Sequence, residues 1–216
     1  MTDILWQARD LGFAYPGQAA LFEGLSFSLR TRDRILLRGA NGCGKSTLLS
    51  LLMGILEPVT GSLELKGKKP SELSPAAWRD LVFCRQSAPA NLFGLTPGHD
   101  LATWQLAFPE RFSEQAVREL DDPLLQKLDS VYTSLSGGEL RAFSLLWLPL
   151  LKDKFWLLDE PTAGLDASRK ERFAQLCADK AETESSMLIV SHDPVLPQDL
   201  FDRVLLLELG KLRELK

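Results

Sequence analysis

Residues 39–47 read Gly-Ala-Asn-Gly-Cys-Gly-Lys-Ser-Thr and fit the pattern G-x-x-x-x-G-K-[ST]. An apolar run at 35–37 precedes them and a helix-like run at 48–53 follows, which is the strand-loop-helix setting that a phosphate-binding loop needs. Glycines lack a Cβ atom, so the backbone can turn tightly and direct successive N–H groups at phosphate oxygens. We interpret the stretch as a nucleotide-binding loop. The alternative is a glycine-rich turn with an incidental lysine.

Three side chains of this loop have distinct predicted roles. Lys45 supplies a positive charge for the outer phosphates, Ser46 offers a hydroxyl to Mg²⁺, and Thr47 can reach the inner phosphate. Further contacts to the nucleotide are expected from Gly39, Asn41, Gly42, Cys43 and Gly44.

The three cysteines, Cys43, Cys84 and Cys177, are scattered and show no C-x-x-C spacing. That pattern argues against a disulfide framework and against a zinc site. Cys84 and Cys177 are interpreted as small buried apolar residues. Cys43 differs because it lies inside the phosphate loop, so we predict that its alkylation blocks nucleotide binding.

Composition narrows the class of protein. The 216 residues are 45% apolar, which suits one large globular domain or two small ones. A net charge of -4 provides no basic surface of the kind that nucleic-acid binding usually needs. The first five residues show no signal peptide, and the apolar run at 142–151 is too short to cross a bilayer. We therefore expect a cytoplasmic protein.

Hydrophobic periodicity predicts an α/β fold. Alternation at 11–15 and 25–29 predicts half-buried strands of an antiparallel β region. The unbroken apolar runs at 155–158 and 187–190 predict parallel strands that are covered on both faces. Residues 137–151 and 167–180 are predicted as helices, the first interrupted near its end by Pro149. The proline-containing stretch 88–135 is predicted to be an inserted, mostly helical subdomain.

Two carboxylates follow directly after the apolar run at 155–158. An aspartate at the end of a strand next to the phosphate loop can hold Mg²⁺ through water. We therefore predict that Asp159 holds Mg²⁺ opposite Ser46. The adjacent Glu160 is then placed to polarise an attacking water molecule. The alternative is that the pair caps the segment that follows it.

Residues 135–139 read L-S-G-G-E, and together with the loop and the carboxylate pair they resemble the signature of ATP-binding cassette (ABC) ATPases. The resemblance covers nearly the whole chain. It implies a P-loop NTPase fold with a mainly parallel core sheet, in a single ABC ATPase domain over 1–216. Within that domain it implies a nucleotide-binding core with the β region at about 1–87 and 136–216, and the helical subdomain at 88–135.

The other elements of the family occur in the family's order. Gln86 matches the Q-loop, residues 163–166 match the D-loop and residues 191–193 match the H-loop. Tyr15 falls where the family places an aromatic ring that stacks on adenine, although Phe13 competes for that role.

The resemblance also implies roles across two subunits. Ser136, Gly137 and Gly138 begin a helix and would cap the γ-phosphate bound to a second cassette, so that a homo- or heterodimer holds two ATP molecules. Asp166 would join the two sites across the interface, and His192 would hydrogen-bond the γ-phosphate. The implied catalytic residues are Glu160, His192, Gln86 and Lys45, and the implied magnesium ligands are Ser46, Gln86 and Asp159.

The chain departs from the family in the helix after the signature. The family usually has arginines at the positions of Ala142 and Trp147, and Arg141 lies one step away. This change alters the salt-bridge partners of the helix and predicts that Trp147 packs in a core or against a neighbouring chain.

The leading functional prediction is an ATP-binding and ATP-hydrolysing subunit of a membrane ABC transporter. It would lie on the inner face of the membrane and drive a separate transmembrane permease. Residues 86–96, followed by Asp100, resemble the importers of the energy-coupling-factor and cobalt type. The alternative is a soluble, non-transport ABC ATPase that acts on nucleic acid or ribosomes. Such relatives carry a long coiled-coil insertion or two cassettes, and we expect no nucleic-acid partner. A third hypothesis, a binding module without turnover, conflicts with the intact Lys45 and Glu160.

Overall fold

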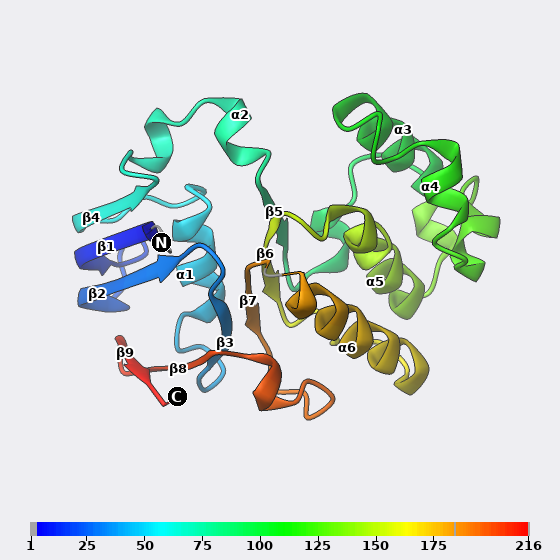
Figure 1. Cartoon of the computed structure of the whole chain (residues 1–216). Helices are drawn as coiled ribbons and strands as arrows, with labels where there is room; N and C mark the ends of the chain where they lie inside the picture. Colours follow the sequence, from blue (N-terminus) through cyan, green and yellow to red (C-terminus); the bar gives the residue numbers. More distant parts are fainter. Residues whose placement is uncertain (1–3, 184, 216) are drawn as a thin grey trace.

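A computed structural model describes residues 4–183 and 185–215 and contains two β-sheets flanked by helices (Figure 1). The larger sheet has the strand order β5-β6-β7-β3-β8-β9, and the smaller has the order β2-β1-β4. Within these residues no helix is both long and apolar enough to cross a membrane.

The larger sheet forms the centre of the α/β core. Its strands are β3 (Arg34–Arg38), β5 (Leu81–Cys84), β6 (Phe155–Asp159), β7 (Met187–Val190), β8 (Arg203–Glu208) and β9 (Lys211–Glu214). The first five run parallel, and β9 returns antiparallel to β8 as a closing hairpin. Every residue of β6 and β7 is buried, which confirms the prediction from their unbroken apolar runs.

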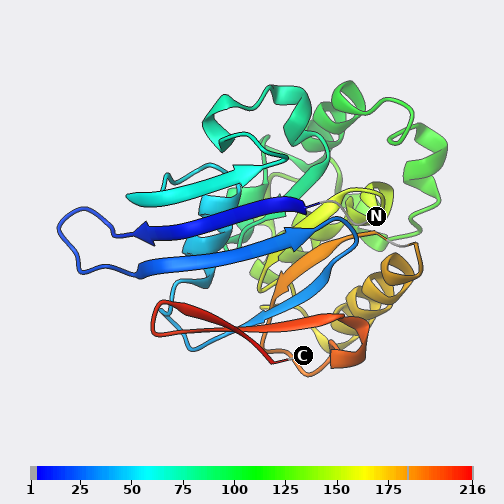
Figure 2. The ribbon, with the colours of Figure 1, turned by 60° about the vertical axis from the view of Figure 1, so that its left-hand side comes forward.

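The smaller sheet is antiparallel, as the alternating residues predict. It consists of β1 (Ile4–Phe13), β2 (Phe22–Arg30) and β4 (Thr60–Leu65), which lie side by side in Figure 2. It packs on α1 (Lys45–Leu52), where Trp6 is fully buried and its indole Nε1 donates to the carbonyl of Leu52 at 3.1 Å. This sheet therefore supports the helix that carries the phosphate loop.

The helix predicted over 137–151 is shorter than expected. The helix α5 (Gly137–Leu145) ends before a separate 3₁₀ turn, η5 (Leu148–Leu151). Pro149 lies at the second position of that turn, where its missing N–H costs nothing, whereas inside a continuous α-helix it would remove a hydrogen bond. The helix α6 (Ala167–Glu182) agrees with its prediction and extends slightly further.

Short helices make up most of the stretch 88–135. They are η2 (Ala88–Asn91), α3 (Pro97–Ala107), α4 (Glu114–Arg118), η3 (Pro123–Lys127) and η4 (Tyr132–Ser134); outside this stretch lie η1 (Pro70–Glu72), α2 (Pro75–Trp78) and η6 (Gln198–Leu200). Their apolar cluster also includes Phe143 and Trp147, which come from α5 and the residues just after it. Trp147 is buried with its ring centroid 6.0 Å from that of Phe112, which confirms the prediction that it packs in a core. We propose that the helical subdomain includes α5 as well as residues 88–135.

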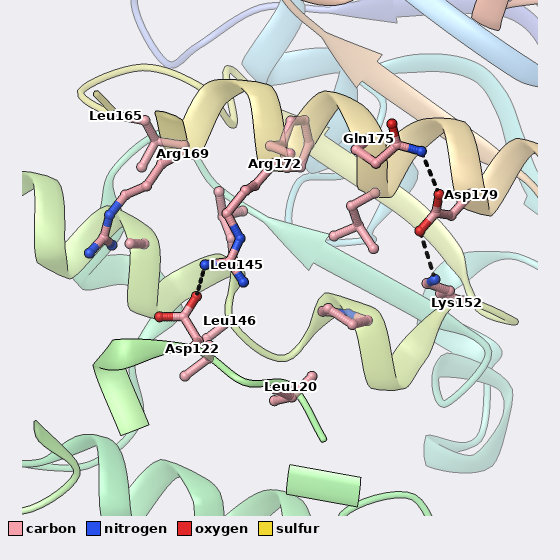
Figure 3. Close-up of a pocket in the computed structure, with 14 residues that line it drawn as sticks. Leu120, Asp122, Leu145, Leu146, Lys152, Leu165, Arg169, Arg172, Gln175 and Asp179 are labelled. Carbon is pink, nitrogen blue, oxygen red and sulfur yellow. Dashed lines mark hydrogen bonds and ion pairs between the residues drawn. The ribbon is translucent and has the colours of Figure 1, made fainter. Parts of the chain in front are cut away.

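The seam between this subdomain and the core runs beside α6. A cavity of about 310 Å³ lies there between α5, α6 and the loop at 120–122 (Figure 3). An ion pair crosses the seam from Arg172 to Asp122 at 3.2 Å, and a second, from Lys152 to Asp179 at 3.3 Å, lies beside the cavity within the core. No residue of the phosphate loop lines this cavity, so it is separate from the candidate nucleotide site.

Candidate nucleotide-binding site

The phosphate loop connects β3 to α1 through three glycines with positive φ angles. Gly39, Gly42 and Gly44 have φ values of 153°, 79° and 105°, which side chains with a Cβ atom rarely adopt. At Gly39 a Cβ atom would also lie 2.4 Å from the carbonyl oxygen of Leu207 on β8. The loop thus lies directly against the neighbouring strand, which only glycine allows.

Lys45 is held inside the loop by the loop's own backbone. Its Nζ donates to the carbonyl oxygens of Gly39 at 2.6 Å and Ala40 at 3.0 Å, and the side chain is buried. These bonds hold the ammonium group against the loop, and Lys45 is itself the first residue of α1. The positive charge and the helix N-terminus together favour an anion at this place.

A cavity of about 670 Å³ opens on the loop and gathers most of the predicted site residues. Its lining includes Gln18, Ala19, Ala20, Leu21 and Ala163, together with the predicted residues Tyr15, Asn41, Gly42, Gly44, Lys45, Ser46, Thr47, Gln86, Asp159 and Glu160. They meet because β3, β5 and β6 run parallel, so the segments after these strands lie at one edge of the sheet.

The segment 18–21 was not predicted to line the site. It follows the turn at 16–18, in which the N–H of Gln18 donates to the carbonyl oxygen of Tyr15 at 3.0 Å. The turn residues Pro16 and Gly17 beside Tyr15 were the signal that the chain reverses here and that this segment returns toward the site.

Asp159 fits the role of a magnesium ligand. It is 4% exposed, and burial raises the pKa of its carboxyl despite the opposing hydrogen bond with Ser46 and the charges of Arg141 and Lys45. A buried carboxylate with a hydroxyl partner matches the hard oxygen ligands that Mg²⁺ prefers, and Mg²⁺ usually takes its remaining ligands from water and phosphate. The described residues contain no cluster of three or more His, Cys, Asp or Glu side chains suited to a metal. The arrangement therefore fits an ion held jointly with a nucleotide.

Glu160 has a strained backbone beside the cavity. Its φ of 47° is left-handed, and its N–H donates to the carbonyl of Val190 at 2.9 Å, while its own carbonyl accepts from Ala163 N–H at 3.1 Å. Burial raises the pKa of its carboxyl above the ordinary value, although the nearby His192 opposes this. Strain that is held by several neighbours is common at functional sites, and a raised pKa suits a general base.

The two candidate aromatic residues lie in different surroundings. Phe13 is 6% exposed and belongs to the core, whereas Tyr15 is 38% exposed and lines the cavity. The Tyr15 hydroxyl hydrogen-bonds Thr47 Oγ1 at 3.0 Å, and its ring is nearly perpendicular to that of Phe13, with the two centroids 5.0 Å apart. This geometry favours Tyr15 over Phe13 as the ring that contacts a base.

The signature residues do not line the cavity. Ser136 caps α5 in a reciprocal arrangement: its Oγ accepts from Glu139 N–H at 3.3 Å, and the Glu139 carboxylate accepts from Ser136 N–H at 2.9 Å. Lys127 also binds Glu139, and these contacts lower the pKa of that carboxyl to about 2. Gly138 lies beside the D-loop, where an added Cβ atom would be 3.2 Å from the carbonyl oxygen of Gly164.

Four further predicted residues also lie outside the lining. Asp166 caps α6 by accepting from Arg169 N–H at 2.8 Å, and it is exposed. His192 is exposed, with its Nε2 3.7 Å from Glu160 Oε1. Gly39 packs on β8, and Cys43 lines a neighbouring cavity formed with 206–211.

Labelling of Cys43 with N-ethylmaleimide is expected to weaken ATP binding by at least about tenfold, because an adduct forces residues of a packed loop apart. Cys43 Sγ packs against Gly39, only 2.7 Å from where a Cβ atom on that glycine would stand, so an adduct on the sulfur lies directly beside the phosphate loop. The reaction should be selective, because Cys84 and Cys177 are buried. Titration of the labelled chain with ATP measures the effect, and Cys43→Ser treated identically is the control. Unchanged affinity after stoichiometric labelling would contradict the prediction.

Comparison with known proteins places these features in one family. The sequence pattern of the family described as "ABC transporter" matches residues 22–163. The chain is 34% identical over 206 residues to the molybdate import ATP-binding protein MolC of Haemophilus influenzae, covering 92% of this chain and 77% of that protein. It is 32% identical over 220 residues to the cobalt import ATP-binding protein CbiO of Rhodobacter capsulatus, covering 98% and 78%.

Solved structures support the same fold. The ATP-binding subunit of an ABC transporter superposes with a TM-score of 0.79 at 21% identity, covering 98% of this chain and 90% of that one. The cbiO1 protein of Clostridium perfringens, described as part of the complex cbiONQ, superposes with a TM-score of 0.72 at 22% identity, covering 98% and 87%.

Proposed function

Because this chain belongs to the ABC transporter family and is an ATPase of that family, we propose that it hydrolyses ATP as one of two cassettes arranged head to tail. This proposal rests on one observation: the cavity of a single chain lacks the signature residues. The cavity contains the phosphate loop, Gln86 and the carboxylate pair, but Ser136, Gly137 and Gly138 lie outside its lining. In one chain the N-terminus of the signature helix therefore lies outside the cavity that holds the chain's own phosphate loop. A second copy, or a similar cassette, would supply that N-terminus to the γ-phosphate.

Within each site the chain's own groups bind the nucleotide, orient the reacting groups and accept a proton from water. The loop N–H groups and Lys45 hold the phosphates, and Tyr15 contacts the adenine. Glu160 accepts a proton from the attacking water, Gln86 approaches that water, and His192 hydrogen-bonds the γ-phosphate. Ser46 and Asp159 would hold Mg²⁺, which supplies charge neutralisation at the phosphates when bound.

The partner that uses this hydrolysis is proposed to be a transmembrane permease. Phe93 and Leu95 are 61% and 74% exposed, just beyond the Gln86 turn. Phe93 lines a groove of about 270 Å³ together with Leu92, Trp104, Phe143 and Trp147. An exposed apolar rim beside an apolar groove suits a short helix of a membrane protein. Closure of the two cassettes would move this surface, and the chain would lie on the inner face of the membrane through that contact.

The relatives favour this role over the alternative. Those compared above are named as ATP-binding proteins of importers for molybdate and cobalt. None of these comparisons supports an ATPase that acts on nucleic acid or ribosomes.

The double variant Phe93→Glu/Leu95→Glu is expected to lose co-purification with the permease of its own transporter, because charged groups would meet an apolar contact. Wild-type chain co-expressed with that permease should be retained on the tagged membrane protein. Val59→Glu, at an exposed apolar position on the other side of the core, is the matched control and should be retained. Retention of the double variant at the wild-type level would contradict the proposed surface.

A further inference from the structure

Arg141 is a buried cation whose partners are almost all backbone carbonyls. The residue is 2% exposed, and its guanidinium donates to the carbonyl oxygens of Pro161 at 2.9 Å, Arg85 at 2.8 Å and Asp159 at 3.0 Å. It also donates to the carbonyl oxygen of Glu160. Burial of a charge is costly unless hydrogen bonds satisfy it, so this arrangement must be held with little freedom.

One set of these bonds fixes the backbone that carries the carboxylate pair. Three consecutive carbonyls, from Asp159 to Pro161, face the guanidinium. The middle one belongs to Glu160, whose left-handed φ of 47° is unfavourable for a residue with a side chain. Such strain persists only when the surroundings over-determine it, and Arg141 supplies part of that constraint.

The remaining bond fixes the turn that carries Gln86. The carbonyl of Arg85 accepts from Arg141 and also from Asn91 Nδ2 at 2.9 Å. The Asn91 side chain closes the turn from the other side, because its Oδ1 accepts from Arg85 N–H at 2.7 Å. The carbonyl that immediately precedes Gln86 is therefore held by two donors.

We propose that Arg141 is a positioning residue that locks the backbones of Glu160 and Gln86 into one geometry at the nucleotide cavity. The inference rests on the roles proposed above for these two residues. Arg141 stands on α5, the helix that begins with the signature, so the same side chain ties that helix to both segments. A lysine cannot replace it, because one ammonium cannot span four carbonyls that a planar fork with five donors reaches together.

The test compares Arg141→Lys and Arg141→Met with wild type by ATP titration, steady-state hydrolysis and amide hydrogen exchange. Each variant is expected to keep ATP affinity within about threefold and to lose about 100-fold in kcat, since small misplacements of catalytic groups have effects of this size. Exchange should accelerate in peptides covering 85–91 and 159–163 and stay unchanged elsewhere. A merely structural role would instead lower kcat and ATP binding together and accelerate exchange throughout.

Arg203→Lys is the matched control. Arg203 also makes several bonds, to Ser28, Asp33 and Glu214, but it lies at the opposite end of the parallel strands from the phosphate loop. The kcat of Arg203→Lys at saturating ATP should equal that of wild type. Glu160→Gln tests the premise separately, because retained hydrolysis there refutes the proposed role of Glu160 itself. If Glu160→Gln is inactive while Arg141→Lys hydrolyses ATP at the wild-type rate, the positioning role is overturned. A global loss of protection in Arg141→Lys would overturn it as well.

Discussion

Glu160→Gln should lower ATP hydrolysis by about 10³-fold and leave ATP binding intact, because an amide of the same shape cannot accept a proton from water. The substitution preserves the backbone bonds of residue 160 to Val190, Ala163 and Arg141, so the strained turn is expected to survive. Phosphate release measures turnover, and ATP titration under the same conditions measures binding.

The pH dependence of turnover provides a second check on this residue. Burial raises the pKa of the Glu160 carboxyl above its ordinary value of 4.5, and only the ionised form accepts a proton. Wild-type turnover should therefore fall on acidification at a higher pH than an exposed glutamate would give. Glu171→Gln, on the exposed face of α6, should retain the wild-type rate and profile. If Glu160→Gln hydrolyses ATP at a rate within about threefold of wild type, the loss is too small for a general base, and Glu160 does not have that role.

The sequence predicts the core of this fold well because its signals are local and physical. The runs at 155–158 and 187–190 are apolar at every position, and the strands β6 and β7 that they form are buried throughout. Once parallel strands are predicted, the convergence of their carboxyl ends follows from topology. The phosphate loop, Gln86 and Asp159 meet in one cavity for this reason, although they are far apart in the chain.

Other features depend on packing that no local pattern encodes. A shift of one residue turns a side chain by about 100° around a helix, so Arg141 cannot contact what an arginine at position 142 would contact. Instead the Arg141 guanidinium donates to four backbone carbonyls, and the residues next to Arg141 in the sequence do not predict these contacts. The end of α5 at Leu145 was likewise missed, because Pro149 predicts a break only near itself. The packing of α5 on the residues of 88–135 follows from Phe143 and, just after the helix, Trp147, whose apolar partners come from residues distant in sequence.

Lys45→Ala and Gly137→Asp should each abolish hydrolysis. The first damages the phosphate loop, and the second damages the signature, which in the proposed dimer serves the site of the other chain. Loss of Lys45 removes the charge that meets the phosphates. A Cβ atom added at Gly137 meets no atom within 4 Å beyond its chain neighbours and its own helix, so the position has room for a side chain. A carboxylate in the first turn of a helix also stabilises that helix. The Gly137→Asp chain should therefore fold normally and still bind ATP, yet repel the γ-phosphate of its partner. Thermal unfolding and ATP titration of each variant alone establish these points.

Mixing the two inactive chains should restore hydrolysis. A heterodimer contains one site built from an intact loop and an intact signature, and one site in which both are defective. Random pairing makes half of the dimers mixed, so the mixture should reach about a quarter of the wild-type rate per chain. A mixture of Lys45→Ala with wild type, at matched concentration, calibrates the pairing. If gel filtration with labelled chains shows heterodimers and the mixture remains inactive, the loop and the signature do not complete one site across the interface. Recovery of activity can come only from a site shared between chains, because neither variant has both halves.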